Sequence, residues 1–415
     1  MDPSMADAAN QATAKWLSIV GIGEDGLGGI GAAARQAIGE AEFVFGGARH
    51  LELARQAIKG EARVWPTPFD AAMLDVIALR GRNVCILASG DPFWHGAGVT
   101  IARRVPPAEF RIYPASSSFS LAAARLGWAL QDVETVSLHG RAVERLRPLL
   151  HDGARIIALT SDGGGPAEIA GILARAGFGA SRLQVLEAMG GAAEKASIIV
   201  ASEIGGRTFG PLNVVAIEVV GGEDSRPIAF GGGLPDDLFE HDGQITKSDV
   251  RAMTLAALQP CRGQLLWDIG AGSGSVAISW LLCHPSMRAI AIEGRTDRAD
   301  RIRRNAKNLG TPDLMVIEGE APAALEGLPA PDAIFVGGGG SEPGVMDAAI
   351  AALKPGGRLV ANAVTLEMEA VLLDLHARQG GELVQIALTR AEPIGSMMGW
   401  RPAMPVTRWI WVKPR

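Results

Sequence analysis

The sequence contains few cysteines, and their number and spacing exclude two common ways of holding a fold together. Among 415 residues there are only Cys85, Cys261 and Cys283, and no two of them form a Cys-x-x-Cys pair. An odd number of cysteines without that spacing indicates neither a disulfide framework nor a zinc site. We therefore expect no bound metal, and we predict a reducing, cytoplasmic location.

Basic clusters and long apolar runs are also lacking. The formal net charge is −6, and lysine occurs at only seven positions, which form no basic stripe. Because binding to a phosphate backbone needs such a stripe, we expect no nucleic-acid partner. No apolar run reaches the roughly 18 residues that span a bilayer, and residues 1–15 are polar and acidic, unlike a signal peptide. We therefore expect no membrane association either.

Aromatic residues are scarce and glycines are abundant, which indicates the fold class. Aromatics make up 5% of the chain and glycine occurs 53 times, while 48% hydrophobic and 20% charged residues are usual for a folded globular protein. This composition suits tight strand-to-helix turns better than an aromatic-rich β-sandwich. At roughly 100–200 residues per domain, the length indicates two or three domains. We predict an α/β protein of more than one domain.

In the first half of the chain, strand-like apolar runs alternate with segments of helical period. Most of these runs are bounded by glycine, proline or serine, and they cover residues 16–20, 42–45, 84–88, 110–113, 133–138 and 156–160. This alternation predicts crossover helices and a mostly parallel sheet. Later runs at 182–186, 196–201 and 213–220 follow one another too closely for helices, so we expect hairpins and an antiparallel or mixed sheet there. The first half is therefore predicted to have two lobes.

A loop-like segment divides the chain. Residues 221–243 are dense in glycine, proline and aspartate and have no apolar period. We therefore predict a disordered segment at 1–15, a first domain at 16–222, a linker at 223–240 and a second domain at 241–415.

In the second half the alternation of helices and strands starts again. We predict a helix over 246–258 and strands over 264–269, 288–293, 314–318, 333–336 and 358–361. These strands are typical of a parallel sheet that is buried on both faces. Two late runs, 382–389 and 406–412, are spaced for a hairpin. The pattern predicts a Rossmann-like fold for this half.

The most specific motif follows the first strand of that half. Asp268 ends the strand, and Gly270, Gly272 and Gly274 follow at alternate positions before a helix. Glycines let the backbone approach a ligand, and a helix start attracts an anionic group. Glu293 ends the next strand, where an acidic side chain accepts hydrogen bonds from a ribose. The motif predicts a nucleoside site, and its spacing resembles motif I of class I S-adenosylmethionine (SAM) methyltransferases.

Three further motifs lie in the first half. Residues 21–26 fit Gly-x-Gly-x-x-Gly after a strand, which alone would indicate NAD and an oxidoreductase. The next strand ends without the acidic residue that would bind the ribose, which weakens this alternative. Residues 89–92 read Ser-Gly-Asp-Pro, and residues 114–118 read Pro-Ala-Ser-Ser-Ser. Either of these two segments could serve only to start a helix.

Taken together and in this order, the three motifs resemble the tetrapyrrole (corrin) methylase family. Its hallmarks are an opening Val-Gly-x-Gly turn, a (Gly/Ser)-Gly-Asp-Pro loop and a Pro-x-x-Ser-Ser segment. The resemblance implies a SAM site in a cleft between two α/β lobes. It implies that this first cofactor site is formed by Ser89, Gly90, Asp91, Pro92, Ser117, Ser118, Met189 and Leu212.

The second half carries two more motifs that extend the resemblance. Residues 245–251 are similar to an Ile-Thr-Lys-x-(Asp/Glu)-Val-Arg entry helix, and residues 318–322 to Glu-Gly-Asp-Ala-Pro, with Glu320 in place of the aspartate. Both motifs occur in the class I domain of decarboxylating corrin methyltransferases. The resemblance implies a second cofactor site formed by Thr246, Asp268, Gly270, Gly272, Gly274, Glu293, Glu320 and Ala321.

A tetrapyrrole methylase followed by a class I methyltransferase resembles, over nearly the whole chain, the two-domain precorrin methyltransferases of the cobalamin pathway. The resemblance implies SAM-dependent methylation of the tetrapyrrole precorrin-6B at C5 by the first domain. It implies methylation at C15 and loss of the C12 acetate carboxyl by the second domain, yielding precorrin-8. One SAM site per domain and a homo-oligomer are also implied.

We predict few catalytic side chains, because methyl transfer from a sulfonium depends mainly on positioning. Lys247 and Arg251 lie one helical turn apart, and we predict that they bind substrate carboxylates on a face toward the glycine loop. Asp91 is the third predicted catalytic residue, and the neighbouring loop residue His95 is a candidate substrate contact. The glycine run at 337–340 favours close approach of a large flat substrate.

Three alternative functions remain open at this point. An RNA methyltransferase would need a basic face, and a non-catalytic tetrapyrrole carrier would bind the pigment without transferring a methyl group. An NAD oxidoreductase is supported only by residues 21–26. Cys261 follows a proline, as in cytosine-C5 methyltransferases, but it precedes the first strand of its domain, so we interpret it as a structural residue.

Overall fold

The structure, a computed structural model, describes residues 15–65 and 69–415. The predicted disordered segment at 1–15 lies outside the described residues, except for Lys15. Within the described ranges no helix is both long enough and apolar enough to cross a membrane.

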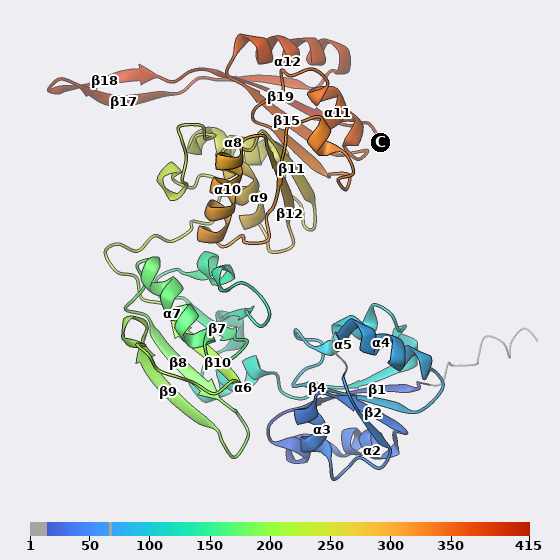
Figure 1. The fold of residues 1–415 in the computed structure, drawn as a ribbon. Coiled ribbons are helices and arrows are strands. Elements are labelled where there is room, and N and C mark those ends of the chain that lie inside the picture. Colours follow the sequence, from blue (N-terminus) through green and yellow to red (C-terminus); the bar gives the residue numbers. More distant parts are fainter. Residues whose placement is uncertain (1–14, 66–68) are drawn as a thin grey trace, which may run out of the picture. The chain divides into compact units, whose positions relative to one another are not determined.

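The chain divides into two compact units. The first comprises the described residues up to Val143 together with His151–Ser225, and the second comprises Glu144–Leu150 together with Arg226–Arg415. Figure 1 shows the helices and strands of each unit. Short 3-10 helices occupy Gly26–Gly29, Pro107–Glu109, Leu130–Asp132, Val143–Leu149, Ala201–Glu203, Asp236–Leu238 and Ala323–Leu325.

A parallel five-stranded sheet forms the first lobe of the first unit, in the order β3-β2-β4-β1-β5. Its strands are β1 (Leu17–Ile22), β2 (Phe43–Gly46), β3 (Glu61–Val64), β4 (Val84–Ser89) and β5 (Phe110–Tyr113). Its helices are α2 (Ala32–Glu40), α3 (Ala48–Ala54), α4 (Phe69–Ala78) and α5 (Ala97–Ala102). The sequence predicts four of these strands. It misses β3, because Glu-Ala-Arg-Val contains no apolar run and most of its side chains are exposed.

The second lobe of the first unit contains a mixed sheet in the order β6-β7-β10-β8-β9. Its elements are α6 (Ser118–Leu126), β6 (Glu134–Ser137), β7 (Arg155–Leu159), α7 (Gly165–Arg175), β8 (Arg182–Glu187), β9 (Lys195–Val200) and β10 (Asn213–Glu218). Strands β6 and β7 are parallel and the other pairs are antiparallel, as the mixed prediction allows. Only β8 and β9 form a hairpin, however, because β10 lies between β7 and β8.

The second unit is built on a seven-stranded sheet in the order β13-β12-β11-β14-β15-β19-β16. Its strands are β11 (Leu265–Ile269), β12 (Arg288–Glu293), β13 (Met315–Glu318), β14 (Ala333–Val336), β15 (Arg358–Ala363), β16 (Glu382–Ile386) and β19 (Val406–Val412). Its helices are α8 (Ser248–Leu258), α9 (Ser275–Leu282), α10 (Thr296–Asn308), α11 (Val345–Ala352) and α12 (Leu366–Gln379). The first five strands are parallel, as predicted.

The two late runs of the second unit pair as predicted, with one addition. Strands β16 and β19 are antiparallel neighbours. Between them the chain forms a second hairpin of β17 (Thr389–Ile394) and β18 (Met397–Pro402), which the sequence analysis misses. Both strands contain proline or glycine and almost all of their side chains are exposed, so neither has the apolar pattern of a buried strand.

The seven-stranded sheet of the second unit is stabilised by burial of both of its faces. Alternate residues of β11 enter different cores: Leu266 packs with residues of α8, α9 and α10, whereas Trp267 and Ile269 pack with residues of α11 and α12. Trp267 and Trp280 are fully buried. Because β11 to β14 are parallel neighbours, their carboxyl ends meet at one edge of the sheet, where ligands of such sheets bind.

Candidate active sites

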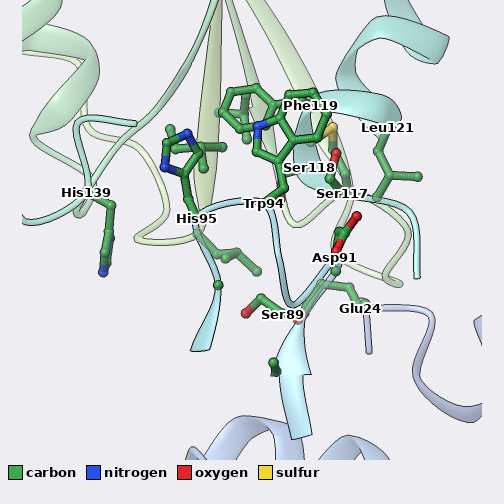
Figure 2. Close-up of a pocket in the computed structure, with 18 of the residues that line it drawn as sticks. Glu24, Ser89, Asp91, Trp94, His95, Ser117, Ser118, Phe119, Leu121 and His139 are labelled. Carbon is green, nitrogen blue, oxygen red and sulfur yellow. The ribbon is translucent and has the colours of Figure 1, made fainter. Parts of the chain in front are cut away.

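The first unit contains a cavity of about 520 Å³ whose wall comes from both of its lobes. Figure 2 shows the loops after β1 and β4 and the start of α6 around it. Of the predicted first cofactor site, all residues except Pro92 line this cavity: Ser89, Gly90, Asp91, Ser117, Ser118, Met189 and Leu212.

Close backbone contacts bring the three motifs of the first half together. A Cβ atom on Gly21 would lie 1.8 Å from the carbonyl oxygen of Gly90 and 2.8 Å from the amide nitrogen of Ala115. The amide of Gly90 donates to the Ile22 carbonyl at 3.2 Å, and the Gly90 carbonyl accepts from the Ala115 amide at 3.2 Å. Because Gly21 has no side chain, the backbones of the two other motif loops can pack directly against the opening turn.

Two of the predicted polar residues also stabilise their own loops. The Ser117 hydroxyl accepts a hydrogen bond from the Ser120 amide at 3.1 Å and so caps α6. Asp91 Oδ1 accepts from the Phe93 amide at 2.8 Å, which leaves its other carboxylate oxygen for the cavity. His95, the candidate substrate contact, lines the same cavity and has a φ of +59°, in the left-handed region. Burial and the charge of Arg141 lower its pKa.

A polar cluster that the sequence analysis does not single out lies at the same cavity. Arg49 Nη1 contacts Glu24 Oε1, and Arg49 Nη2 lies 2.9 Å from His50 Nε2 and 3.2 Å from Ser89 Oγ. His50 Nε2 lies 2.8 Å from Ser89 Oγ. A sequence signal did exist: Glu24 stands inside the opening glycine turn, and Arg49 and His50 closely follow the glycine pair at the end of β2.

The second unit contains a cavity of about 560 Å³ at the carboxyl edge of its sheet. Four residues of the predicted second cofactor site line it, and they are Gly270, Glu293, Glu320 and Ala321. The other four, Thr246, Asp268, Gly272 and Gly274, do not line it. The glycine run contributes Gly338 and Gly339 to the wall.

Glu293 is held in place by the loops around it. It is buried at the end of β12, where Oε2 accepts from the Gly272 amide at 2.8 Å and Oε1 accepts from the Arg295 amide at 3.1 Å. Gly272 therefore acts on the cavity through Glu293. Gly274 has a φ of +74°, and a Cβ atom there would lie 2.7 Å from Ile302 Cγ2, so this glycine permits α9 to pack against α10.

Asp268 is buried in the protein and does not line the cavity. Its side chain is almost fully buried, and Oδ2 accepts from the Ala277 amide in the first turn of α9 at 2.9 Å. Burial raises the pKa of this carboxyl to about 7. The structure thus gives Asp268 a role in holding the start of α9, in place of the direct cofactor contact that the sequence analysis implies.

The structure contradicts the carboxylate-binding role predicted for Arg251. Its side chain is fully buried, and Nη1 donates to Asp236 Oδ1 at 3.2 Å and to the Thr246 carbonyl at 2.7 Å. Its guanidinium also contacts the Leu234 carbonyl and lies 4.7 Å from the centre of the Phe239 ring. A group enclosed in this way cannot bind a substrate.

Lys247 and Arg251 both contact Asp236, and the predicted orientation of their shared face toward the glycine loop stays a prediction. Lys247 Nζ lies 3.8 Å from Asp236 Oδ2. The Lys247 side chain is half exposed, but it does not line the cavity. A catalytic role for Lys247 stays a prediction.

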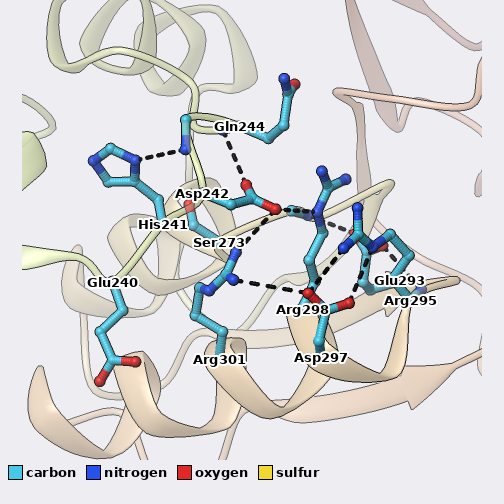
Figure 3. Close-up of polar contacts among 12 residues, drawn as sticks. Glu240, His241, Asp242, Gln244, Ser273, Glu293, Arg295, Asp297, Arg298 and Arg301 are labelled. Carbon is cyan, nitrogen blue, oxygen red and sulfur yellow. Dashed lines mark hydrogen bonds and ion pairs between the residues drawn. The ribbon is translucent and has the colours of Figure 1, made fainter.

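Residues 240–246, which precede α8, lie against the glycine loop and are held by ion pairs. We call this segment the strap. Figure 3 shows Asp242 between two arginines of α10: its Oδ2 accepts from Arg298 Nε at 2.9 Å and forms an ion pair with Arg301, whose Nη1 lies 3.2 Å away. These arginines hold the pKa of Asp242 well below its usual range. A Cβ atom on Gly272 would lie 3.3 Å from the Gln244 carbonyl, so the strap lies against the glycine loop.

No arrangement of three or more histidine, cysteine, aspartate or glutamate residues that could hold a metal ion occurs in residues 15–65 and 69–415.

Comparison with known proteins gives the family. Residues 17–204 match the tetrapyrrole (corrin/porphyrin) methylases, and residues 237–413 match a precorrin methyltransferase domain. The chain is 58% identical over 412 residues to the precorrin-6Y C(5,15)-methyltransferase (decarboxylating) of Sinorhizobium sp., covering 99% of this chain and 100% of that protein. It is 37% identical over 396 residues to the protein of the same name from Mycobacterium tuberculosis H37Rv, covering 95% and 98%.

A solved structure also matches. The C-terminal domain of precorrin-6Y C5,15-methyltransferase from Rhodobacter capsulatus is 50% identical, covers 45% of this chain and 100% of that chain, and gives a TM-score of 0.43. The two full-length relatives are methyltransferases, so they give no support to the oxidoreductase, RNA methyltransferase or carrier alternatives. The chain belongs to the family of decarboxylating precorrin-6Y C(5,15)-methyltransferases, which are SAM-dependent enzymes.

Proposed function

We propose that the protein methylates precorrin-6B at C5 and C15 and removes the carboxyl group of the C12 acetate, yielding precorrin-8 in cobalamin biosynthesis. The first unit would methylate C5, and the second unit would methylate C15 and decarboxylate. Each unit would bind one SAM molecule. The names of the full-length relatives support both methylations and the decarboxylation.

One observation supports the division of labour most directly: each unit has its own cavity, and each cavity is lined by the motif residues of one methyltransferase family. A separate protein of Salmonella typhimurium gives further support. It is named cobalt-precorrin-6B C(15)-methyltransferase (decarboxylating), and it is 34% identical over 179 residues, covering 42% of this chain and 92% of that protein. That length is close to the length of the matched segment 237–413.

The residues of the second cavity fit a nucleoside and a positively charged methyl donor. Gly270, Gly338 and Gly339 offer backbone without side chains, and Glu293 is oriented by two amides so that its remaining lone pairs can accept from a ribose. Bound SAM supplies an electrophilic methyl group on a sulfonium sulfur. Carboxylates in the wall favour such a cation.

The same charges support decarboxylation in the second unit. Among the described residues that line the cavity, Glu293, Glu320 and Glu342 stand against Arg298, which is itself paired with Asp242. A substrate carboxylate in this cavity would meet like charges and little compensation. Its loss as carbon dioxide would relieve that repulsion, with the electron pair passing to the protonated macrocycle.

Calorimetric titration of the full chain with S-adenosylhomocysteine tests the proposal. We expect two molecules bound per chain. Glu293→Ala should abolish binding in the second unit only, and Leu212→Trp, which fills the rim of the first cavity, should abolish it in the first unit only. Glu326→Ala, at an exposed position away from both cavities, is the control and should still bind two.

Product analysis with methyl-¹³C SAM and precorrin-6B completes this test. Leu212→Trp should lose the C5 methyl, and Glu293→Ala should lose the C15 methyl together with the decarboxylation. One molecule bound per wild-type chain, or loss of the same methyl group in both variants, would overturn the assignment of one site to each unit.

We further propose a cytoplasmic homo-oligomer without nucleic-acid or membrane partners, and the β17–β18 hairpin supports self-association. Its cross-strand pairs place Ala391, Pro393, Met398 and Trp400 on one face. The other face carries three charged residues and the apolar pair Ile394 and Met397. Trp400 is 76% exposed. An apolar face of this kind is typical of an interface. Light scattering should show an oligomer in the wild type and a monomer in Trp400→Glu; a monomeric wild type would contradict this proposal.

A further inference from the structure

We propose that His50 accepts, through the Ser89 hydroxyl, the proton that the substrate releases when the first unit methylates C5. This inference rests on the proposed function, because that proposal assigns the C5 methylation to the first unit.

The chemical balance of the reaction requires a proton acceptor. A π electron pair of the substrate forms the new bond from C5 to the methyl carbon, while the bond from that carbon to sulfur breaks and its electron pair stays on sulfur. The substrate is then a cation that carries both hydrogen and methyl on C5. Loss of this hydrogen as a proton returns its bonding pair to the conjugated system. The products are the neutral methylated substrate, S-adenosylhomocysteine and one proton.

The contacts of His50 make it an acceptor at the cavity wall. His50 and Ser89 both line the cavity, and His50 Nε2 lies 2.8 Å from Ser89 Oγ. Figure 2 shows Ser89 among the residues that line the cavity, with Glu24 and Asp91. A guanidinium can only donate, so Arg49 Nη2 donates to His50 Nε2 across 2.9 Å.

These contacts determine the tautomer of the imidazole. If Nε2 accepts from Arg49, then the hydrogen of the neutral ring is on Nδ1. The Ser89 hydroxyl can then only donate in its contact with Nε2, and it shares the single lone pair of Nε2 with Arg49. The oxygen of Ser89 accepts one hydrogen bond from Arg49 Nη2 at 3.2 Å, and its remaining lone pair can accept a proton from the substrate as the hydroxyl passes its own proton to Nε2. The two groups form a short path from the cavity to a partly buried base.

The surroundings keep His50 neutral and ready to accept. Burial first, and the charge of Arg49 second, lower the pKa of His50 to about 4. The charged groups that face the imidazole are Arg49 and, through its ion pair with Arg49, Glu24. A base this weak is sufficient, because the proton comes from a cationic carbon acid whose ionisation restores conjugation.

The other titratable groups of the cavity are less well placed. Glu24 is paired with Arg49, and Asp91 caps its own loop. His139 has Nδ1 3.2 Å from the Thr160 carbonyl, and His95 packs against the ring of Phe119 with 6.0 Å between ring centroids. His95 and His139 are therefore the two rival acceptors, and they belong in the test.

The first experiment compares His50→Gln with His95→Gln and His139→Gln in the full chain. With methyl-¹³C SAM and precorrin-6B, we expect His50→Gln to lower kcat for C5 methylation by about 100-fold, the range of general-base catalysis. The affinity for S-adenosylhomocysteine should change by less than a factor of about three, which is small beside the tenfold that 1.4 kcal/mol represents. C15 methylation by the second unit is the internal control, together with His284→Gln outside both cavities.

Several outcomes would overturn the inference. C5 methylation by His50→Gln close to the wild-type rate, a loss found instead in His95→Gln or His139→Gln, or a loss explained by cofactor affinity alone would each do so. Absence of C5 methylation in the wild type would instead refute the proposed function. Ser89→Ala should cost as much as His50→Gln, and the double variant no more than either, since both act in one path.

A second experiment separates proton transfer from a structural role. Arg49→Gln removes the nearby charge that lowers the pKa of His50, so the acid limb of kcat for C5 methylation should move to higher pH. Added imidazole should restore activity to His50→Ala. An unmoved acid limb together with no rescue by imidazole would show that His50 only supports the loop.

Discussion

The two cavities differ in what their walls offer to a ligand. The first is lined by imidazole, guanidinium, hydroxyl and indole groups and by the carboxylates of Glu24 and Asp91, which come from two lobes. The second is lined mainly by glycine backbone and carboxylates at one edge of a single sheet, with Arg298 as its one basic side chain among the described residues. A wall of side chains can exchange protons, whereas a wall of backbone and fixed charges sets shape and electrostatic potential. If each cavity serves one methylation, as we propose, the two reactions would depend on different kinds of groups in the same chain.

Gly21→Ala should have the largest effect, the loss of cofactor binding in the first unit alone. A Cβ atom at this position would lie 1.8 Å from the Gly90 carbonyl oxygen, and backbone cannot move aside as a side chain can. We expect the Ser89–Pro92 loop to be displaced, at a cost of about 1–3 kcal/mol from overpacking, with loss of cofactor binding in the first unit. Titration with S-adenosylhomocysteine should then give one molecule per chain.

Gly28→Ala is the matched control for Gly21→Ala. A Cβ atom on Gly28 would meet nothing within 4 Å, so two molecules should still bind. Binding of two molecules by Gly21→Ala would contradict the close contact of the motif loops.

Arg251→Met should affect the second unit alone, through its stability. The variant removes the guanidinium that donates to Asp236 and to the carbonyls of Leu234 and Thr246, and among the described residues Asp236 keeps only its ion pair with Lys247. Breaking such a buried pair costs about 3 kcal/mol. Hydrogen exchange, read on peptides of each unit separately, should show faster opening in the second unit only. Lys247→Met, which removes the half-exposed partner of the same aspartate, should cost less than about 1 kcal/mol.

If Arg251→Met kept its protection from hydrogen exchange but lost affinity for the substrate, the carboxylate-binding role that the sequence suggests would be restored. That outcome would add a second guanidinium, besides that of Arg298, to the groups that act on the ligand of the second unit.

Local patterns explain which features the sequence predicts. The parallel strands and the glycine turns are recognisable because apolar runs, acids at strand ends and glycine spacing are local. The burial of Arg251 and Asp268 cannot be recognised from local patterns, because it depends on Phe239 and Ala277 lying against them in the folded unit. Likewise His50 becomes notable only because β2 and β4 are neighbours, which brings it to Ser89. The family resemblance implies cofactor contacts, but it does not separate wall residues from those that support them.

Asp268→Asn should change the pH dependence of the second unit. The unfolded carboxyl titrates near pH 3.9, whereas burial raises its pKa in the fold to about 7. Between these values the folded state holds the extra proton, so the free energy of unfolding falls as the pH rises, by up to about 1.4 kcal/mol per pH unit. The amide oxygen of the variant side chain would still accept from the Ala277 amide, but the side chain would not titrate.

Urea unfolding at several pH values measures this slope. The wild type should show it, and so should Asp300→Asn, whose side chain is exposed. Asp268→Asn should not. An equal slope in all three proteins would show that Asp268 is ionised in the fold.

Arg298→Gln should produce the smallest effect, a modest fall in the affinity of the second unit for S-adenosylhomocysteine. Arg298 lines the cavity and holds the strap through Asp242, which also forms an ion pair with Arg301. Loss of one partly exposed ion pair costs up to about 1 kcal/mol, so the affinity of the second unit for S-adenosylhomocysteine should fall by about fivefold or less. The first unit should bind unchanged. Arg303→Gln, on the same helix but paired with Asp300 and absent from the cavity wall, should leave both affinities unchanged. If Arg298→Gln and Arg303→Gln behaved alike, the strap would contribute nothing to binding, and the second cavity would owe its affinity to the glycine loops and Glu293 alone.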